Sequence, residues 1–416
     1  MSNQDPKKYH SFIDKQSVAK VLYYKVVGFT IIFFGFFSAM QVYNWPLLKY
    51  WGVKGHINFA DLNSVLGSAD CFRTIGFAIY DYPIGHECAY NYGSWLMLSI
   101  SALGLKESHT DLIGWFFIFG LSFLLAIVVG QVKTKPITLL LGFFVFLSPP
   151  VMLLLERGNF DILIIFLIFI SAMLVKYKKN NLGILLVFAS FLYKFYTAGL
   201  ALLVTLFSRN AFAFVFWITL FGVGIFQVFF DFQRGPGFIN TEQNSFGSPI
   251  FGIYLKYLGF ELSYLFSLLL GLILVVIGVR LFSLKNSPTR KCFVDLKDSC
   301  HDLFILPPVF LFFIIVHTTS YILGMNFDYR LIMVAIANYI LITQSKLAPR
   351  TRNLLGIITV LIMWTSFNFK FLQPIGDVLI WFITVHYIFL IWWFVLSTHR
   401  GNVIYQFLRR LFHKFA

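Results

Sequence analysis

The chain has 416 residues, of which 58% are hydrophobic and only 12% are charged. A soluble protein carries about 25% charged residues, so this chain lacks the polar side chains to cover a water-soluble globule. Composition therefore excludes a soluble enzyme, a disordered tail, a secreted disulfide scaffold and a nucleic-acid module. The net charge of +15 is better explained by Lys and Arg that orient membrane spans than by binding to nucleic acid.

Ten apolar segments are predicted to span a membrane, because a span needs about 20 mostly apolar residues. In chain order they lie near 26–48, 111–131, 136–155, 160–175, 211–230, 261–280, 302–321, 329–345, 353–370 and 377–397. The first follows five lysines and has no convincing cleavage site, so we expect a retained signal anchor that starts in the cytoplasm. The sequence predicts one all-α polytopic membrane domain over 1–416.

The apolar stretch 182–207 is interrupted by Lys194. If it were a single span, every later loop would change sides and the basic segment 280–297 would face outward, against the usual cytoplasmic excess of Lys and Arg. We therefore predict a short helical hairpin with Lys194 near its tip. That model has about twelve membrane segments, with both termini in the cytoplasm.

The two longest loops, 49–110 and 231–260, then lie on the same, outer side of the membrane. This asymmetry predicts that the protein acts on that side. We find no internal repeat and no inverted pair of halves, which weakens the interpretation as a secondary transporter.

The first outer loop holds three acidic residues of interest, Asp61, Asp70 and Asp81. A single loop Asp is most simply a turn residue or a helix cap, but this loop also contains His, Glu and several Tyr, which favours a functional site. Cys71 and Cys88 lie in the same loop and are candidates for a disulfide if the outer side is oxidising.

Further charged residues fall at the outer ends of later spans. They are Glu156, Arg157 and Asp161 between two spans, Lys194 in the hairpin, His317, and the pair Asp328 and Arg330. Simple alternatives exist for each: surface ion pairs, a snorkelling lysine, and an Asp328–Arg330 pair. Charges at a membrane boundary are nevertheless costly unless they are paired or functional. Together they suit a reaction between a polar acceptor and a phosphate-bearing lipid, with cations on the phosphate and a carboxylate as base.

These motifs also resemble glycosyltransferase family 87, the mannosyltransferase-like enzymes with the GT-C membrane fold. The resemblance is carried by Asp61 after the first span, Glu156-Arg157-Gly158-Asn159-Phe160-Asp161, Lys194-Phe-Tyr196 and Asp328-Tyr329-Arg330-Leu331, and covers roughly residues 55–335. The chain has Thr197 and Asn-Tyr-Gly93 where members often have proline, so the subfamily and the sugar stay open.

The resemblance implies transfer of a sugar from a polyprenyl monophosphate, with inversion, to a hydroxyl of a lipid-linked or cell-surface glycan. It implies Asp61 as general base, with Asp70 and Asp81 next in line. His317 would assist at the phosphate or acceptor. The donor phosphate would be held by Arg157, Lys194 and Arg330. Sugar or acceptor hydroxyls would be bound, or the cations oriented, by the remaining acidic residues: Glu156, Asp161, Asp328 and the loop residues Asp70 and Asp81.

The donor in such a reaction is already activated, so we expect no cofactor and no metal; the sequence has no Walker motif and no Asp-x-Asp pair. The expected location is a bacterial inner membrane, with the site facing the periplasm and a surface polysaccharide such as O-antigen as acceptor. The alternatives are a lipid-linked glycan flippase or transporter, and an O-antigen polymerase or ligase. All of these readings require the scattered charges to converge in one pocket.

Overall fold

The computed structural model describes most of the chain. The described residues are 6–42, 59–81, 88, 93–130, 136–206, 211–234, 245–246, 255, 264–283, 308–323, 326–344, 347–368 and 372–398. Their regular structure is helical except for one short antiparallel pair, β1 (Ser245–Phe246) with β2 (Asn326–Phe327). The prediction of an all-α protein is confirmed at this level.

Each predicted apolar segment overlaps at least one helix, and the predicted outer loop 49–110 contains two more, α3 and α4. The α-helices are α1 (Pro6–Val42), α3 (Ala60–Ile75), α4 (Ser94–Ala102), α5 (Thr110–Gly130), α6 (Pro136–Phe146), α7 (Pro149–Glu156), α8 (Asp161–Lys176), α9 (Asn180–Tyr193), α10 (Ala198–Leu206), α11 (Ala211–Arg234), α13 (Tyr264–Ser283), α15 (Val309–Leu323), α16 (Ile332–Gln344), α17 (Pro349–Asn368) and α18 (Gln373–Thr398). Four 3₁₀ turns accompany them: η1 (Gly76–Asp81), η2 (Glu107–His109), η3 (Phe195–Thr197) and η4 (Asp328–Leu331).

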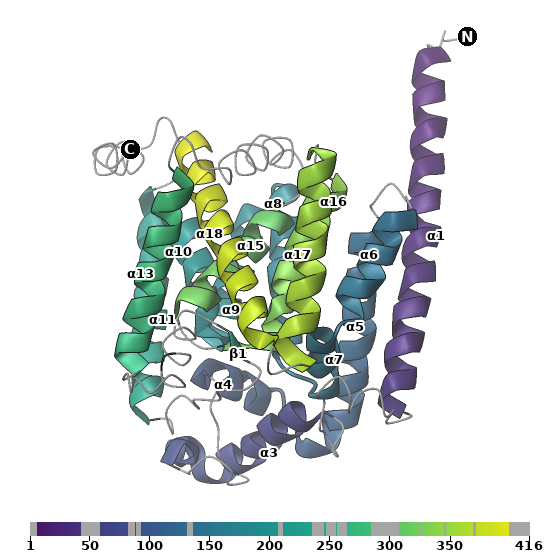
Figure 1. The fold of residues 1–416 in the computed structure, drawn as a ribbon. Coiled ribbons are helices and arrows are strands. Elements are labelled where there is room, and N and C mark those ends of the chain that lie inside the picture. The colour runs from purple at the N-terminus through teal and green to yellow at the C-terminus, as the bar shows by residue number, and fades with distance from the viewer. Residues whose placement is uncertain are drawn as a thin grey trace.

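The long helices run side by side as a bundle, and α3 and α4 lie across one end of it (Figure 1). We call α3, η1, α4 and η2 the cap. Helix α1 begins at the end of the bundle opposite the cap and runs along α5 toward it. The first predicted outer loop is therefore a helical layer that covers one end of the bundle.

The stretch 182–207 folds as the predicted hairpin. Phe188 stacks on Trp217, and Phe191 stacks on Phe221, with centroids 5.0 and 5.3 Å apart. The later residue of α9 stacks on the later residue of α11, so the two helices run in the same direction. Helix α10, which connects them, must therefore run in the opposite direction. The turn falls at Lys194, whose backbone is extended between α9 and η3.

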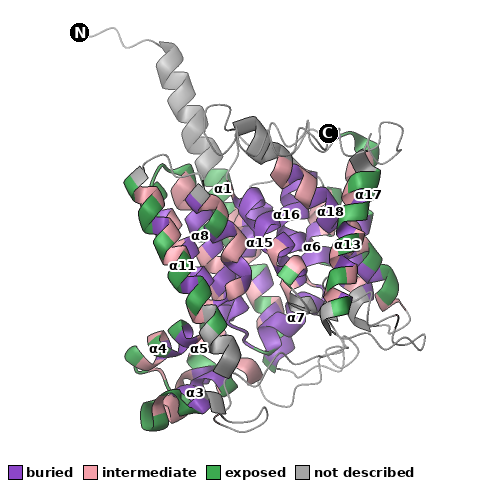
Figure 2. Cartoon of the chain, turned by 90° about the vertical axis from the view of Figure 1, so that its left-hand side faces the viewer, coloured by how far each residue is buried: buried purple, intermediate pink, exposed green. Residues whose placement is uncertain are grey.

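Burial separates central from peripheral helices. Figure 2 shows α15 and α16 buried at the centre, while α11 and α17 turn exposed faces outward. These outward faces are apolar: Phe212 is 81% exposed and Phe226 is 69% exposed. Exposed apolar surface of this extent is unusual for a protein surrounded by water.

Three helical stretches among the described residues are long and apolar enough to cross a membrane, Lys20–Val42, Glu107–Gly130 and Gln373–Trp392. A fourth is added if α6 and α7, bent by 49°, form one broken span. The other apolar stretches found among the described residues have 10–17 residues, although α11 and α13 have 24 and 20 residues in full. Helix α16, at about 1.5 Å per residue, falls short of a bilayer core of roughly 30 Å. The length criterion thus supports a membrane-associated protein, with three or four candidate spans among the described residues; the ten to twelve predicted segments stay a prediction. Some helices are short because a polar segment interrupts the apolar sequence. Helix α9 ends before Lys194, and α16 begins only after η4.

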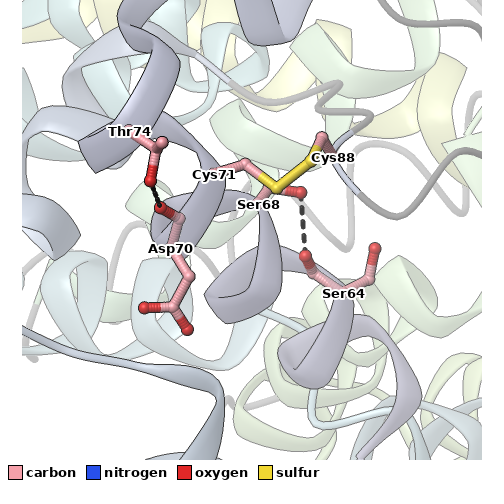
Figure 3. Close-up of a disulfide and its surroundings, with 6 residues drawn as sticks. All are labelled: Ser64, Ser68, Asp70, Cys71, Thr74 and Cys88. Carbon is pink, nitrogen blue, oxygen red and sulfur yellow. Dashed lines mark hydrogen bonds between the residues drawn. A yellow bond between two sulfur atoms is a disulfide. The ribbon is translucent and has the colours of Figure 1, made fainter.

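The predicted disulfide between Cys71 and Cys88 is present and joins α3 to the segment 17 residues further on. Figure 3 shows it beside the α3 residues that accompany Cys71. On the same helix, the Ser68 hydroxyl donates to the carbonyl of Ser64 at 2.9 Å, one turn back. The disulfide therefore anchors the second half of α3. The first half is anchored by hydrogen bonds to the turn between α7 and α8.

Candidate functional site

The cap meets the bundle where the first turn of α3 packs on the turn between α7 and α8. The N–H groups of Asp61 and Leu62 donate to the Arg157 carbonyl at 2.9 and 3.3 Å, and the N–H of Phe59 donates to the Glu156 carbonyl at 2.8 Å. Helix α3 has no side-chain N-cap, so these main-chain carbonyls accept N–H groups that a capping side chain would usually satisfy. Asp61 is thereby held against the α7–α8 turn.

Gly158 makes this close approach possible. Its φ is +57°, a left-handed conformation that favours glycine. A Cβ at this position would also lie only 3.0 Å from the Cβ of Phe59 and 3.2 Å from that of Leu62. A larger residue would therefore separate α3 from the turn that carries Arg157.

The Asp61 carboxylate accepts hydrogen bonds from two residues of the turn. Arg157 donates through Nε to Oδ1 at 2.7 Å and forms an ion pair through its terminal nitrogen, and the Asn159 amide donates to Oδ2 at 2.5 Å. The Asp61 side chain keeps 16% exposure and that of Arg157 keeps 45%. This charged pair lies at the rim of the bundle and is accessible from outside it.

A second carboxylate lies deeper, at the start of α8. Asp161 is fully buried, and its Oδ1 accepts from Lys194 Nζ at 2.9 Å and from the Tyr196 hydroxyl at 2.8 Å. Its Oδ2 accepts from Arg330 Nε at 2.9 Å. The Arg330 guanidinium also lies 4.6 Å above the Tyr196 ring, within cation–π distance. Two cations thus share one buried carboxylate, and the three residues carry one net positive charge.

Asn159 connects the Asp61 carboxylate to the main chain of Asp161. Its side-chain carbonyl accepts the N–H of Asp161 at 2.9 Å, and its amide nitrogen donates to Asp61. Asn159 is fully buried. Neither Asn159 nor Tyr196 was among the predicted site residues, although both lie inside the quoted motifs. Their polarity next to charged residues was the only available signal.

The two cations reach Asp161 from breaks between helices. Lys194 follows the last turn of α9, and its carbonyl accepts a hydrogen bond from the Thr197 hydroxyl at 3.1 Å, which tightens η3. Arg330 belongs to η4, which packs against α7. The family that the chain resembles often has proline at the position of Thr197. In this chain the Thr197 hydroxyl instead forms a hydrogen bond within the turn.

His317 and Glu156 differ from these residues in their surroundings. His317 is buried in α15, and its Nε2 lies 3.0 Å from the Thr384 hydroxyl of α18. Its proposed part at the phosphate stays a prediction. Glu156 ends α7 next to Arg157 and is 7% exposed.

Asp70 belongs to a joint within the cap. It forms an ion pair with Arg73 and accepts the N–H of Glu107 at 3.1 Å, which ties α3 to η2. Partial burial by itself would raise the pKa of Asp70, but the Glu107 N–H and the Arg73 guanidinium outweigh it and hold the pKa below its ordinary value. These contacts favour a structural role for Asp70 over the predicted one at the sugar or acceptor.

Other predicted features lie outside the described residues. The side chains of Asp81, at the end of η1, and Asp328, at the start of η4, are not described, and neither is most of the loop 231–260. Within the described part of the chain, no group of three or more His, Cys, Asp or Glu residues is arranged to hold a metal ion.

No protein-family model, no curated protein and no solved structure matches this chain. The similarity to glycosyltransferase family 87 therefore remains a prediction from the motifs that contain Asp61, Arg157, Lys194 and Arg330.

The site combines an accessible carboxylate with a buried cationic cluster. A carboxylate offers about four lone-pair positions, and Arg157 and Asn159 occupy three of those on Asp61, which leaves one able to accept a proton. The net positive charge beneath it favours a bound anion. The arrangement is suited to taking a proton from a hydroxyl while a negatively charged group is held nearby.

Proposed function

We propose that the protein is a membrane glycosyltransferase that moves a hexose from a polyprenyl-phosphate sugar to a hydroxyl of a lipid-linked or surface glycan such as O-antigen. The observation that carries the proposal is the accessible Asp61 carboxylate, held by Arg157 and Asn159 and joined to the buried Asp161 cluster. A proton acceptor next to a cationic site is what a phosphate-leaving glycosyl transfer requires.

In this proposal the chain is a multi-pass GT-C protein of a bacterial inner membrane, with the cap and Asp61 in the periplasm and both termini in the cytoplasm. The Cys71–Cys88 disulfide supports an oxidising compartment for the cap. The basic turn Lys176–Lys179 between α8 and α9, remote from the Asp161 end of α8, supports a cytoplasmic location for the other end of the bundle. The exposed apolar faces of the outer helices would contact lipid and the polyprenyl chain.

The reaction is a single inverting displacement. The acceptor hydroxyl oxygen attacks the anomeric carbon, and its proton passes to the Asp61 carboxylate. The bond between the anomeric carbon and the phosphate oxygen breaks, and the polyprenyl phosphate leaves with the electron pair. Asp61 later releases its proton to water, so no cofactor is consumed.

Arg157, Lys194 and Arg330 are the proposed phosphate ligands. Arg330 uses Nε on Asp161, and a guanidinium has five N–H donors in all. Charge-assisted hydrogen bonds from these groups would stabilise the charge that develops on the leaving phosphate. Asp161 would hold Lys194 and Arg330 in position before the donor binds.

The test uses the purified full chain in lipid nanodiscs, supplied with a panel of polyprenyl-phosphate hexoses and acceptor glycolipids. We expect one donor to be consumed, and Asp61→Asn to lower the rate about 100- to 10,000-fold, the range for loss of a general base. Asp111→Asn, an exposed acid at the start of α5, is the matched control and should keep the wild-type rate. Consumption of no donor, or full activity in Asp61→Asn, would refute the proposal; lipid translocation without consumption would favour a flippase.

A further inference from the structure

The two carboxyl groups beside the proposed base have opposite surroundings. Asp161 accepts hydrogen bonds on both oxygens from Lys194, Tyr196 and Arg330. Glu156 is also more than nine-tenths buried, at 7% exposure, but within the described part of the chain its carboxylate accepts no hydrogen bond and forms no ion pair. The family resemblance implied the same two alternatives for Glu156 and Asp161, orienting cations or binding sugar hydroxyls. The contacts in the structure differ between the two residues and favour a different role for each.

Glu156 lies on the Asp61 side of the cluster. Its main-chain carbonyl accepts the N–H of Phe59, immediately before α3, and Arg157 and Asp61 are the charged groups that act on its carboxyl. Arg157 follows it directly in sequence, yet directs Nε and a terminal nitrogen to Asp61 instead. Glu156 is therefore next to the proposed base without being neutralised by the nearest cation.

A largely buried carboxyl group without a hydrogen-bond donor is unfavourable, because it has lost much of its hydration and has gained no hydrogen bond in return. Such a group is expected to bind a ligand that supplies hydrogen-bond donors. A cationic ligand is disfavoured, since the charge of Arg157 already acts on this carboxyl and no group of three or more His, Cys, Asp or Glu in the described part of the chain could hold a metal ion. A phosphate is disfavoured as well, because an ionised phosphate only accepts hydrogen bonds. Neutral hydroxyl groups satisfy both conditions.

We propose that Glu156 binds the hydroxyl groups of the transferred hexose and so determines which sugar is accepted. Two neighbouring hydroxyls would donate to its two carboxylate oxygens while the anomeric carbon lies between Asp61 and the phosphate ligands. This inference rests on the proposed function and assigns the sugar-recognition residue within it. Asp161 is then a positioning residue for the cations, and Glu156 is the residue that contacts the sugar.

The experiment measures equilibrium binding of two ligands, a polyprenyl-phosphate hexose and the same polyprenyl phosphate without sugar, to the full chain in nanodiscs. The wild type should bind the hexose-bearing lipid more tightly. Glu156→Gln keeps the size of the side chain but removes its charge, and should weaken binding of that lipid about 10- to 100-fold, the range for loss of a hydrogen bond to a charged group. Binding of the bare polyprenyl phosphate should not change, and Asp111→Asn should alter neither affinity.

A second measurement uses donors that lack one sugar hydroxyl at a time. The wild type should discriminate against the donor that lacks a hydroxyl bound by Glu156, and Glu156→Gln should lose that discrimination. The melting temperature separates this role from a structural one, because removing a buried charge without partners should leave the melting temperature unchanged or raise it.

The outcomes keep the two proposals apart. If the wild type transfers sugar but Glu156→Gln binds both lipids as the wild type does, or weakens both equally, the assignment of Glu156 is overturned and the glycosyltransferase proposal stands. A lowered melting temperature with unchanged sugar discrimination also overturns it, in favour of a structural role. If the wild type consumes no donor and binds both lipids equally, both proposals fail.

Discussion

The two aspartates that Asn159 joins, Asp61 through its carboxylate and Asp161 through its main chain, belong to different regions of the molecule. Asp61 lies in the cap and is reached by donors from one turn, with an arginine that is almost half exposed. Asp161 lies in the bundle and is surrounded by three donors from two other segments of the chain. The first can exchange partners with a substrate, whereas the second is committed to holding its cations. Accessibility therefore distinguishes a reacting group from a positioning group, although the residue type is the same.

The largest effect on stability should come from the bundle. Asp161→Asn would leave Lys194 and Arg330 buried without their shared carboxylate, and breaking a buried ion pair in this way costs about 3–5 kcal/mol. We expect a much lower melting temperature in detergent and no activity. Asp61→Asn, in which the remaining Arg157 is partly exposed, should lose activity with a far smaller change in melting temperature. Equal destabilisation by the two variants would contradict the distinction drawn here.

The next effect should be confined to the cap. Replacing Cys71 and Cys88 by Ser removes a bridge across 17 residues, which is worth on the order of 3 kcal/mol for a loop of this size. Hydrogen exchange should quicken in α3 and η1 but not in α15 and α16. The matched control replaces Ser108, an exposed residue of η2 in the same cap, by Ala. Faster exchange throughout the bundle would mean that the cap does not unfold separately.

Asn159→Ala tests the connection between the regions. It removes hydrogen bonds to Asp61 and to the Asp161 main chain, and the loss of a buried hydrogen bond to a charged group costs about 1.5–3 kcal/mol. We expect a moderately lower melting temperature together with a lower transfer rate, measured on the same preparation. Asn180→Ala, an exposed residue at the start of α9, should change neither. Destabilisation with an unchanged rate would show that Asp61 does not need this amide.

The smallest effect should be a pH dependence within the cap. The pKa of Asp70 is lower in the folded protein than its ordinary value of 3.8, so its contribution to stability is fully present above that value. It is lost as the pH falls from there through the lower folded pKa. Asp70→Asn should therefore reduce cap stability at pH 6 and make little difference at pH 2, as measured by proteolysis between α3 and η2. The same difference at both pH values would exclude this titration. Exposure of Asp70 keeps the effect small.

Local pattern predicted much of the fold. Hydropathy located every long apolar helix among the described residues. The turn between α9 and α10 was predicted at Lys194 because a single span there would have placed the basic segment 280–297 on the outer side. The number of spans stays a prediction beyond the three or four that the described residues support, since hydropathy does not show which helices meet lipid and which, like α15 and α16, are covered by other helices. The site was predicted as a set of residues, but Asn159 and Tyr196 were missed because an amide and a phenol have no distinctive signal at a membrane boundary.

Composition and order along the chain determined that this protein is helical and apolar, where its helices break, and which charged residues fall at their ends. Only the tertiary structure decided the pairing: Arg330 contacts Asp161, 169 positions away, and Arg157 turns from its neighbour Glu156 to Asp61. Hydropathy and turn propensity act over a few residues, whereas an ion pair forms between whichever charges packing brings together. Asp161 accepts three hydrogen bonds and Glu156 accepts none from the described residues, and this difference exists only once the bundle and the cap have assembled.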